Sequence, residues 1–125
     1  MGDYDPYAHA AALGIEVIHR PIRTANGRWF PQHNTIVIRE GLRAVIDRST
    51  LAHELGHATL GHVADSAKNE TQADRIAADN LIRYAELLKV TQWTTHHNTI
   101  AKELGVTGRI LRVYLDAHNL DGSAA

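Results

Sequence analysis

Two histidines and a glutamate are spaced so that they can form a catalytic metal site. The run His53-Glu54-Leu55-Gly56-His57 places two imidazoles four residues apart. On a helix these rings lie on one face, one turn apart, and both can reach a single zinc ion at about 2.0–2.1 Å. Glu54 points to a neighbouring sector of such a helix, so we expect it to act as general base toward an attacking water. The alternative reading is a pair of surface histidines on a helix.

Glu70 is the candidate for the third ligand that a catalytic zinc site needs. It lies thirteen residues beyond His57, at the head of the next segment with helical apolar spacing. Asp74 is one turn further along the same face, where it is predicted to accept a hydrogen bond from the free N–H of a ligating histidine. The alternative for both acids is a favourable position at a helix N-terminus, where the helix dipole attracts negative charge.

His62 competes with Glu70 for this place. Zinc proteases with three histidine ligands continue the motif as His-Glu-x-x-His-x-x-Gly-x-x-His, but here Leu60 and Val63 occupy the last glycine and histidine positions. On a continuing helix His62 would face about 140° away from His57. We therefore prefer Glu70 as the ligand and expect His62 to cap the helix or to support a ligand.

The composition limits the kinds of site and partner that are available. The 125 residues include nine histidines and no cysteine, so a metal can be held only by histidine and carboxylate. Such ligands suit zinc, and they also accept Mn, Fe and Co. The net charge of −1 gives no general case for binding nucleic acid or a membrane. No apolar run is long enough to span a bilayer, and residues 1–12 do not resemble a secretory signal, so we expect a cytoplasmic protein.

The pattern of apolar residues predicts an α+β fold in one domain, residues 1–125. Alternation and turn signals predict strands at 14–22, 27–30 and 34–39, forming a small, mostly antiparallel three-stranded sheet against the histidine helix. A short helix is expected at 42–47, and Ser49 is expected to cap the next helix, which ends near Gly61. The C-terminal half is predicted to be helical, with an apolar stripe after Glu70 and further helices at about 99–104 and 108–118.

These motifs resemble the ImmA/IrrE family of metallopeptidases. The resemblance rests on the run Thr50-Leu51-Ala52-His53-Glu54-Leu55-Gly56-His57-Ala58 with Gly61-His62, and on Glu70-x-x-Ala73-Asp74-x-Ile76-Ala77-Ala78. It extends more loosely to residues 27–39 and 100–107, and so covers most of the chain. Where the family often has Leu-Leu-Met-Pro, this chain has Asn80-Leu81-Ile82-Arg83. Without that proline, the helix is expected to run on toward Val90.

The resemblance implies a zincin-like fold with a small mixed sheet, an active-site helix and a glutamate on the following helix. It implies that His53, His57 and Glu70 bind Zn²⁺, that Glu54 is the base and that Asp74 supports a ligand. Members of the family are typically encoded by phages, mobile elements and bacterial stress loci, and known members cleave a helix-turn-helix repressor. The expected function is therefore zinc-dependent hydrolysis of a peptide bond in such a repressor.

A second hypothesis is a helix-turn-helix module that binds DNA or protein and carries a structural or inactive metal site. Ala101, Gly105 and Leu111 have the spacing of such a motif within residues 91–120, and Arg109 and Arg112 would then face phosphate or bases. The alternative is a pair of packed helices within the protease domain. The near-neutral charge gives DNA binding no support, so we do not expect a nucleic-acid partner.

Two further parts of a peptidase site remain open. A donor opposite Glu54 would stabilise the transition state, and the candidates by chemistry alone are Tyr84, His96, His97 and His118. An extended substrate could pair with an edge strand of the sheet, for which residues 34–39 are the candidate. The oligomeric state is not indicated.

Overall fold

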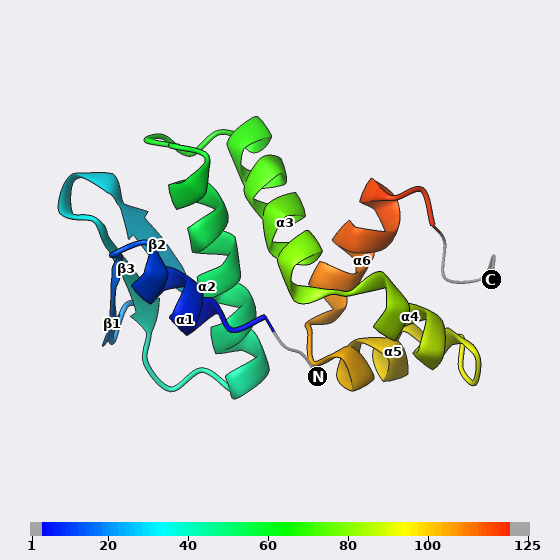
Figure 1. Ribbon diagram of the computed structural model, residues 1–125. Helices are drawn as coiled ribbons and strands as arrows, with labels where there is room; N and C mark the ends of the chain where they lie inside the picture. The colour runs from blue at the N-terminus through cyan, green and yellow to red at the C-terminus, as the bar shows by residue number, and fades with distance from the viewer. Residues whose placement is uncertain (1–3, 121–125) are drawn as a thin grey trace.

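The computed structural model describes residues 4–120 of the chain. The sheet and α1 lie at one end and α4, α5 and α6 at the other, with α2 and α3 between them (Figure 1). The elements in chain order are α1 (Pro6–Ala12), β1 (Glu16–Arg20), β2 (Gly27–Phe30), the 3-10 helix η1 (Pro31–His33), β3 (Thr35–Arg39), α2 (Ala44–Thr59), α3 (Ala67–Leu81), α4 (Tyr84–Thr91), α5 (His97–Leu104) and α6 (Gly108–Ala117). This arrangement confirms the α+β class.

The sheet is mixed, so the prediction of a mostly antiparallel sheet is wrong. Its strand order is β1-β3-β2, with β3 parallel to β1 and antiparallel to β2. The chain reverses once between β1 and β2 and again through η1, where Asn34 adopts a left-handed conformation with φ of 50°. Two reversals return β3 to the direction of β1, and β3 then lies between the two earlier strands. The edge strands are therefore β1 and β2.

Helix α2 is one continuous element, which corrects the prediction of a short helix followed by a second one capped by Ser49. The helix begins at Ala44, and Ser49 lies inside it with 6% of its surface exposed. Burial against neighbouring elements, which the local sequence does not reveal, outweighs the preference of serine for caps. The end of the helix is as expected, since Gly61 has a φ of 71° and no penalty for that conformation.

Helix α3 ends at Leu81, so the prediction that it continues toward Val90 is also wrong. Its N-cap is Ser66, whose hydroxyl accepts a hydrogen bond from the backbone N–H of Asn69 at 3.0 Å. At the other end Ile82 has an extended backbone and is only 3% exposed. We attribute the break to the burial of Ile82 in the helical core, because no proline or glycine is present to cause it.

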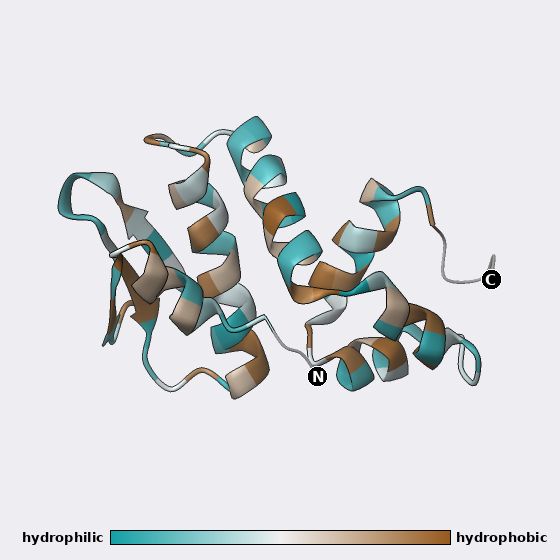
Figure 2. Ribbon diagram, viewed as in Figure 1, coloured by the Kyte–Doolittle hydropathy of each residue, from teal (hydrophilic) through white to brown (hydrophobic). Residues whose placement is uncertain are grey.

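Helix α2 contributes to two hydrophobic cores. One lies between α2 and the sheet and contains Ala10, Ile15, Ile36, Ile38, Leu51 and Leu55. The other joins α2 and α3 to the C-terminal helices, and it includes Ala52 from α2. Apolar and hydrophilic positions alternate along α3 and the helices after it, as expected for elements with one buried face (Figure 2). Burial on opposite sides holds α2 firmly in the middle of the fold.

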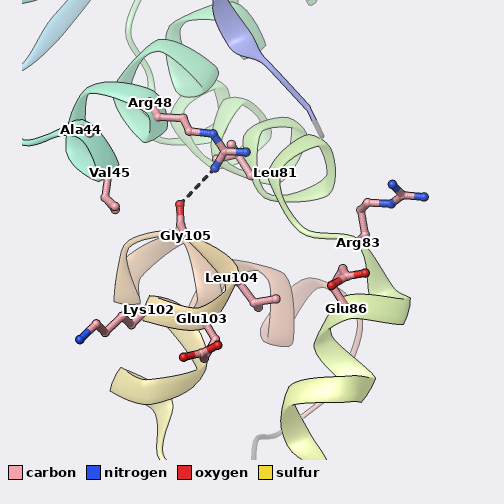
Figure 3. Close-up of a pocket in the computed structure, with 10 residues that line it drawn as sticks. All are labelled: Ala44, Val45, Arg48, Leu81, Arg83, Glu86, Lys102, Glu103, Leu104 and Gly105. Atoms are coloured by element: carbon pink, nitrogen blue, oxygen red, sulfur yellow. Dashed lines mark hydrogen bonds between the residues drawn. The ribbon is translucent and has the colours of Figure 1, made fainter. Parts of the chain in front are cut away.

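Arg48 links the N-terminal part of α2 to the C-terminal helices by a hydrogen bond. Its guanidinium donates to the carbonyl oxygens of Gly105, at 3.1 Å, and Tyr4, at 3.0 Å. The bond to Gly105 crosses a hollow of about 520 Å³ between α2, α4 and α5 (Figure 3). The lining of this hollow includes ions of both signs but no histidine, so it does not offer the chemistry of the motif residues.

No helix of the described residues is long and apolar enough to cross a membrane.

Candidate metal centre

A close crossing of α2 and α3 positions the candidate ligands. A β-carbon added to Gly56 would lie 2.7 Å from the carbonyl oxygen of Ala73 and 2.9 Å from its α-carbon. No side chain fits at such distances, so glycine at position 56 allows the two helix backbones to approach. Glu70 lies one turn before Ala73, and the crossing therefore brings its side chain beside the histidines of α2.

Replacing Gly56 with alanine is expected to separate α2 from α3 and weaken the site. The added methyl group would meet backbone atoms, which cannot rotate away, so we expect a loss of about 1–3 kcal/mol in unfolding free energy. Zinc affinity, measured by competition with a chromogenic chelator, should fall as well. The control is Gly108→Ala, because an added β-carbon there has no neighbour within 4 Å. Equal stability and affinity in both variants would contradict the role given to Gly56.

The three candidate ligands converge on one point. Nε2 of His53 lies 2.9 Å from Oε1 of Glu70, and Nε2 of His57 lies 2.9 Å from its Oε2. One ligand atom from each residue lies within 4.8 Å of the other two. Ligands bound tetrahedrally to one zinc ion at its usual bond lengths are about 3.3 Å apart. The donor set of two imidazoles and one carboxylate, together with this spacing, fits a divalent cation.

The charges around this point also favour a cation. Burial alone lowers the pKa of His53, but the hydrogen bond to Asp74 and the charges of Glu54, Asp74 and Glu70 raise it above its usual value. Burial is also the main cause of the lowered pKa of His57, which Glu70 opposes. Three carboxylates thus surround two imidazoles, and a bound cation would compensate their negative charge.

Asp74 holds the far side of the His53 ring. Its Oδ1 lies 2.7 Å from Nδ1 of His53, and its Oδ2 accepts a hydrogen bond from Arg109 at 2.6 Å. An N–H on Nδ1 leaves Nε2 of His53 with its lone pair toward the metal position. Under the helix-turn-helix hypothesis Arg109 would face phosphate or bases, whereas in the structure its guanidinium donates to Asp74. Helices α5 and α6 follow each other as that hypothesis expected, but Arg109 contacts Asp74 beside the candidate metal centre.

Glu54 lies in a hollow of about 260 Å³ that also exposes His57 and Glu70. The Glu54 residue is 8% exposed, and burial raises the pKa of its carboxyl to about 7 against the opposing effect of His53. The β2 strand can lie this close to α2 because it begins with Gly27, whose added β-carbon would be 2.6 Å from Thr50 and 3.3 Å from Glu54. Glu54 therefore lines the same hollow as two of the candidate ligands.

His62 does not belong to the ligand group of the described residues. Its Nδ1 lies 2.9 Å from Nδ1 of His57, on the ring edge away from Glu70, and its Nε2 lies 3.0 Å from Oε1 of Gln72. The chain turns at Gly61, so the angle expected for a continuing helix does not apply. Two residues that the sequence did not single out lie nearby: Gln72 contacts His62, and Arg28 lines the hollow.

None of the proposed transition-state donors lines this hollow in the described part of the chain. Tyr84 begins α4, and His96 and His97 lie at the start of α5. His118 contacts Asp79 at 2.7 Å. The side chains with N–H donors in the lining are instead Arg28, Trp29, His57 and His62. Their positions depend on how β2 and the loop after α2 approach each other, which residue type alone does not indicate.

Comparison with known proteins agrees with this geometry. The family model described as Peptidase_M78, IrrE N-terminal-like domain, matches residues 10–115. A relative named radiation response metalloprotease IrrE, from Deinococcus radiodurans, is 39% identical over 51 residues. That alignment covers 41% of this chain and 16% of the relative, so it spans only a small part of the relative's length.

Proposed function

Since the chain belongs to the Peptidase_M78 family of metallopeptidases, we propose that it is a zinc-dependent endopeptidase. The family implies a divalent metal, and we assign zinc because two imidazoles and one carboxylate form the ligand set of many catalytic zinc sites. The observation that carries the proposal is the convergence of His53, His57 and Glu70 beside the buried carboxyl of Glu54.

In the proposed hydrolysis the ligands, Glu54 and Asp74 have different roles. A divalent cation held by this ligand set supplies a Lewis acid that acidifies water and polarises the scissile carbonyl. Glu54 accepts the proton of the attacking water and passes it to the leaving amine. Asp74 keeps His53 oriented throughout, because its contact lies outside the reacting centre.

We place the substrate along β2 instead of residues 34–39. The β3 strand is hydrogen-bonded on both sides, whereas β2 has one free edge. Gly27, Arg28 and Trp29 of β2 line the same hollow as Glu54. An extended peptide that pairs with this edge would run past the base and the ligands.

The substrate that we propose is a helix-turn-helix repressor protein of a phage or mobile element. Support for this class comes from the family resemblance alone. A repressor incubated with the purified chain should be cut at a defined bond, which mass spectrometry of the fragments would locate. Cleavage of unfolded casein at many bonds, with the repressor intact, would argue for a general peptidase.

Removal of the metal tests the enzyme class. Dialysis against a chelator is expected to abolish hydrolysis, and one equivalent of zinc should restore it, because the proposed mechanism needs a cation to acidify water and polarise the carbonyl. Metal content by plasma mass spectrometry should follow activity. A control sample dialysed without chelator separates metal loss from instability. Full activity in metal-free protein would rule out the proposed mechanism.

A further inference from the structure

A chain of polar side chains supports His57 on the side away from the metal position. Nδ1 of His57 lies 2.9 Å from Nδ1 of His62, and Nε2 of His62 lies 3.0 Å from Oε1 of Gln72. Gln72 belongs to α3, two residues after Glu70. Helix α3 therefore supplies both the candidate ligand Glu70 and the last residue of this series of contacts, Gln72.

Only one arrangement of protons lets His57 act as a ligand within this chain of contacts. Its Nε2 must be unprotonated to bind a metal, so the neutral ring carries its proton on Nδ1. That N–H can donate only if Nδ1 of His62 is unprotonated, and the proton of neutral His62 is then on Nε2. The side-chain amide oxygen of Gln72, Oε1, accepts a hydrogen bond from that N–H. Each nitrogen then has a compatible partner.

We propose that His62 and Gln72 are positioning residues that fix the tautomer and ring orientation of His57 for metal binding. This inference rests on the proposed function and extends it to His62 and Gln72, to which that function gives no role. His53 is held by a carboxylate, whereas His57 is held by a neutral imidazole and an amide.

The geometry separates this role from that of a ligand. If His62 bound the metal, one of its nitrogens would lie near Nε2 of His57, where Glu70 is located. Instead its Nδ1 faces the opposite nitrogen of that ring, and the two ring centres are 5.2 Å apart at an interplanar angle of 65°. The 2.9 Å between the two Nδ1 atoms is a hydrogen-bond distance.

The test compares zinc affinity in three variants by competition with a chromogenic chelator. His62→Phe keeps a ring but removes the acceptor, so we expect affinity to fall by about 10- to 100-fold. His62→Asn places an amide oxygen near the position of Nδ1 and should recover most of that loss. Gln72→Leu frees the second N–H and should give an intermediate loss. His96→Phe is the matched control, because His96 is exposed and precedes α5 in the helical half.

A nitrogen-15 NMR measurement of the zinc-loaded chain supplies a readout that a purely structural role would not change. His62 should be neutral, with its proton on Nε2. A proton on Nδ1 of His62, or wild-type affinity in His62→Phe, would overturn the inference. If His62→Phe does not fold, as judged by circular dichroism, the NMR result and Gln72→Leu still decide. Wild-type protein that binds no zinc would overturn the proposed function and this inference together. Wild-type protein that binds zinc, with unchanged affinity in His62→Phe, would overturn only this inference.

Discussion

Replacing Glu54 with glutamine is expected to lower kcat for peptide hydrolysis by about 10²- to 10⁴-fold, the usual contribution of a general base. The amide has nearly the shape of the carboxyl group, but it cannot accept a proton from the attacking water. Because His53, His57 and Glu70 are unchanged, zinc should still bind at one ion per chain. The measurement is initial rate on a repressor or peptide substrate, beside metal content of the same sample.

The same substitution at Glu103, an exposed residue of α5, provides the control for Glu54→Gln. Glu103→Gln removes one negative charge from the surface and should leave kcat and metal content unchanged. If Glu54→Gln keeps wild-type kcat, another group takes the proton and the base is assigned wrongly. If it loses zinc as well as activity, Glu54 is required to hold the metal, and its proposed separation from the ligands fails.

Replacing Glu70 with alanine is expected to remove one of three ligands and to lower zinc affinity more than the roughly 10- to 100-fold typical of an outer-shell partner. Hydrolysis should be lost at zinc concentrations that saturate the wild-type chain. The physical reason is that both imidazoles face the oxygens of Glu70, so no other described carboxylate reaches the same point. Excess zinc should restore binding only in part, because two ligands hold the ion weakly.

Glu86→Ala is a matched control for Glu70→Ala. Both glutamates lie in the first turn of a helix, and their side chains are similarly exposed, at 41% for Glu70 and 47% for Glu86. The control should bind zinc as the wild type does. If Glu70→Ala also keeps wild-type affinity, the third ligand lies elsewhere, and His62 becomes the next residue to test.

The helical part of the site could be predicted because it depends on local geometry. A helix places residues four apart on one face, so the spacing of His53 and His57 is sufficient to bring their rings together. The ring centres are 4.8 Å apart in the structure. Glu70 required a further assumption, that the next helix packs against the first, and the absence of a side chain at Gly56 lets the backbone at Ala73 come close.

The supports of the two histidines could be predicted only in part. Asp74 follows Glu70 by one helical turn, so its contact with His53 could be expected once α3 was placed. Arg109 comes from a helix much later in the chain, and its attachment to Asp74 depends on the packing of α6 against α3. The contact between His62 and Gln72 depends on the turn at Gly61, which changes the direction that a helix would have given His62.

By itself, the sequence determined the α+β class, the helical face that carries the two histidines and the likeness to a metallopeptidase family. These properties follow from periodicity and residue type over a few turns, where each residue's neighbours are set by the backbone. Only the tertiary structure decided that β3 lies between β1 and β2, that α3 ends at Leu81 and that Arg109 contacts Asp74. Those outcomes depend on burial and pairing between segments that are distant in the sequence. The free energy of these contacts cannot be predicted from a local sequence pattern.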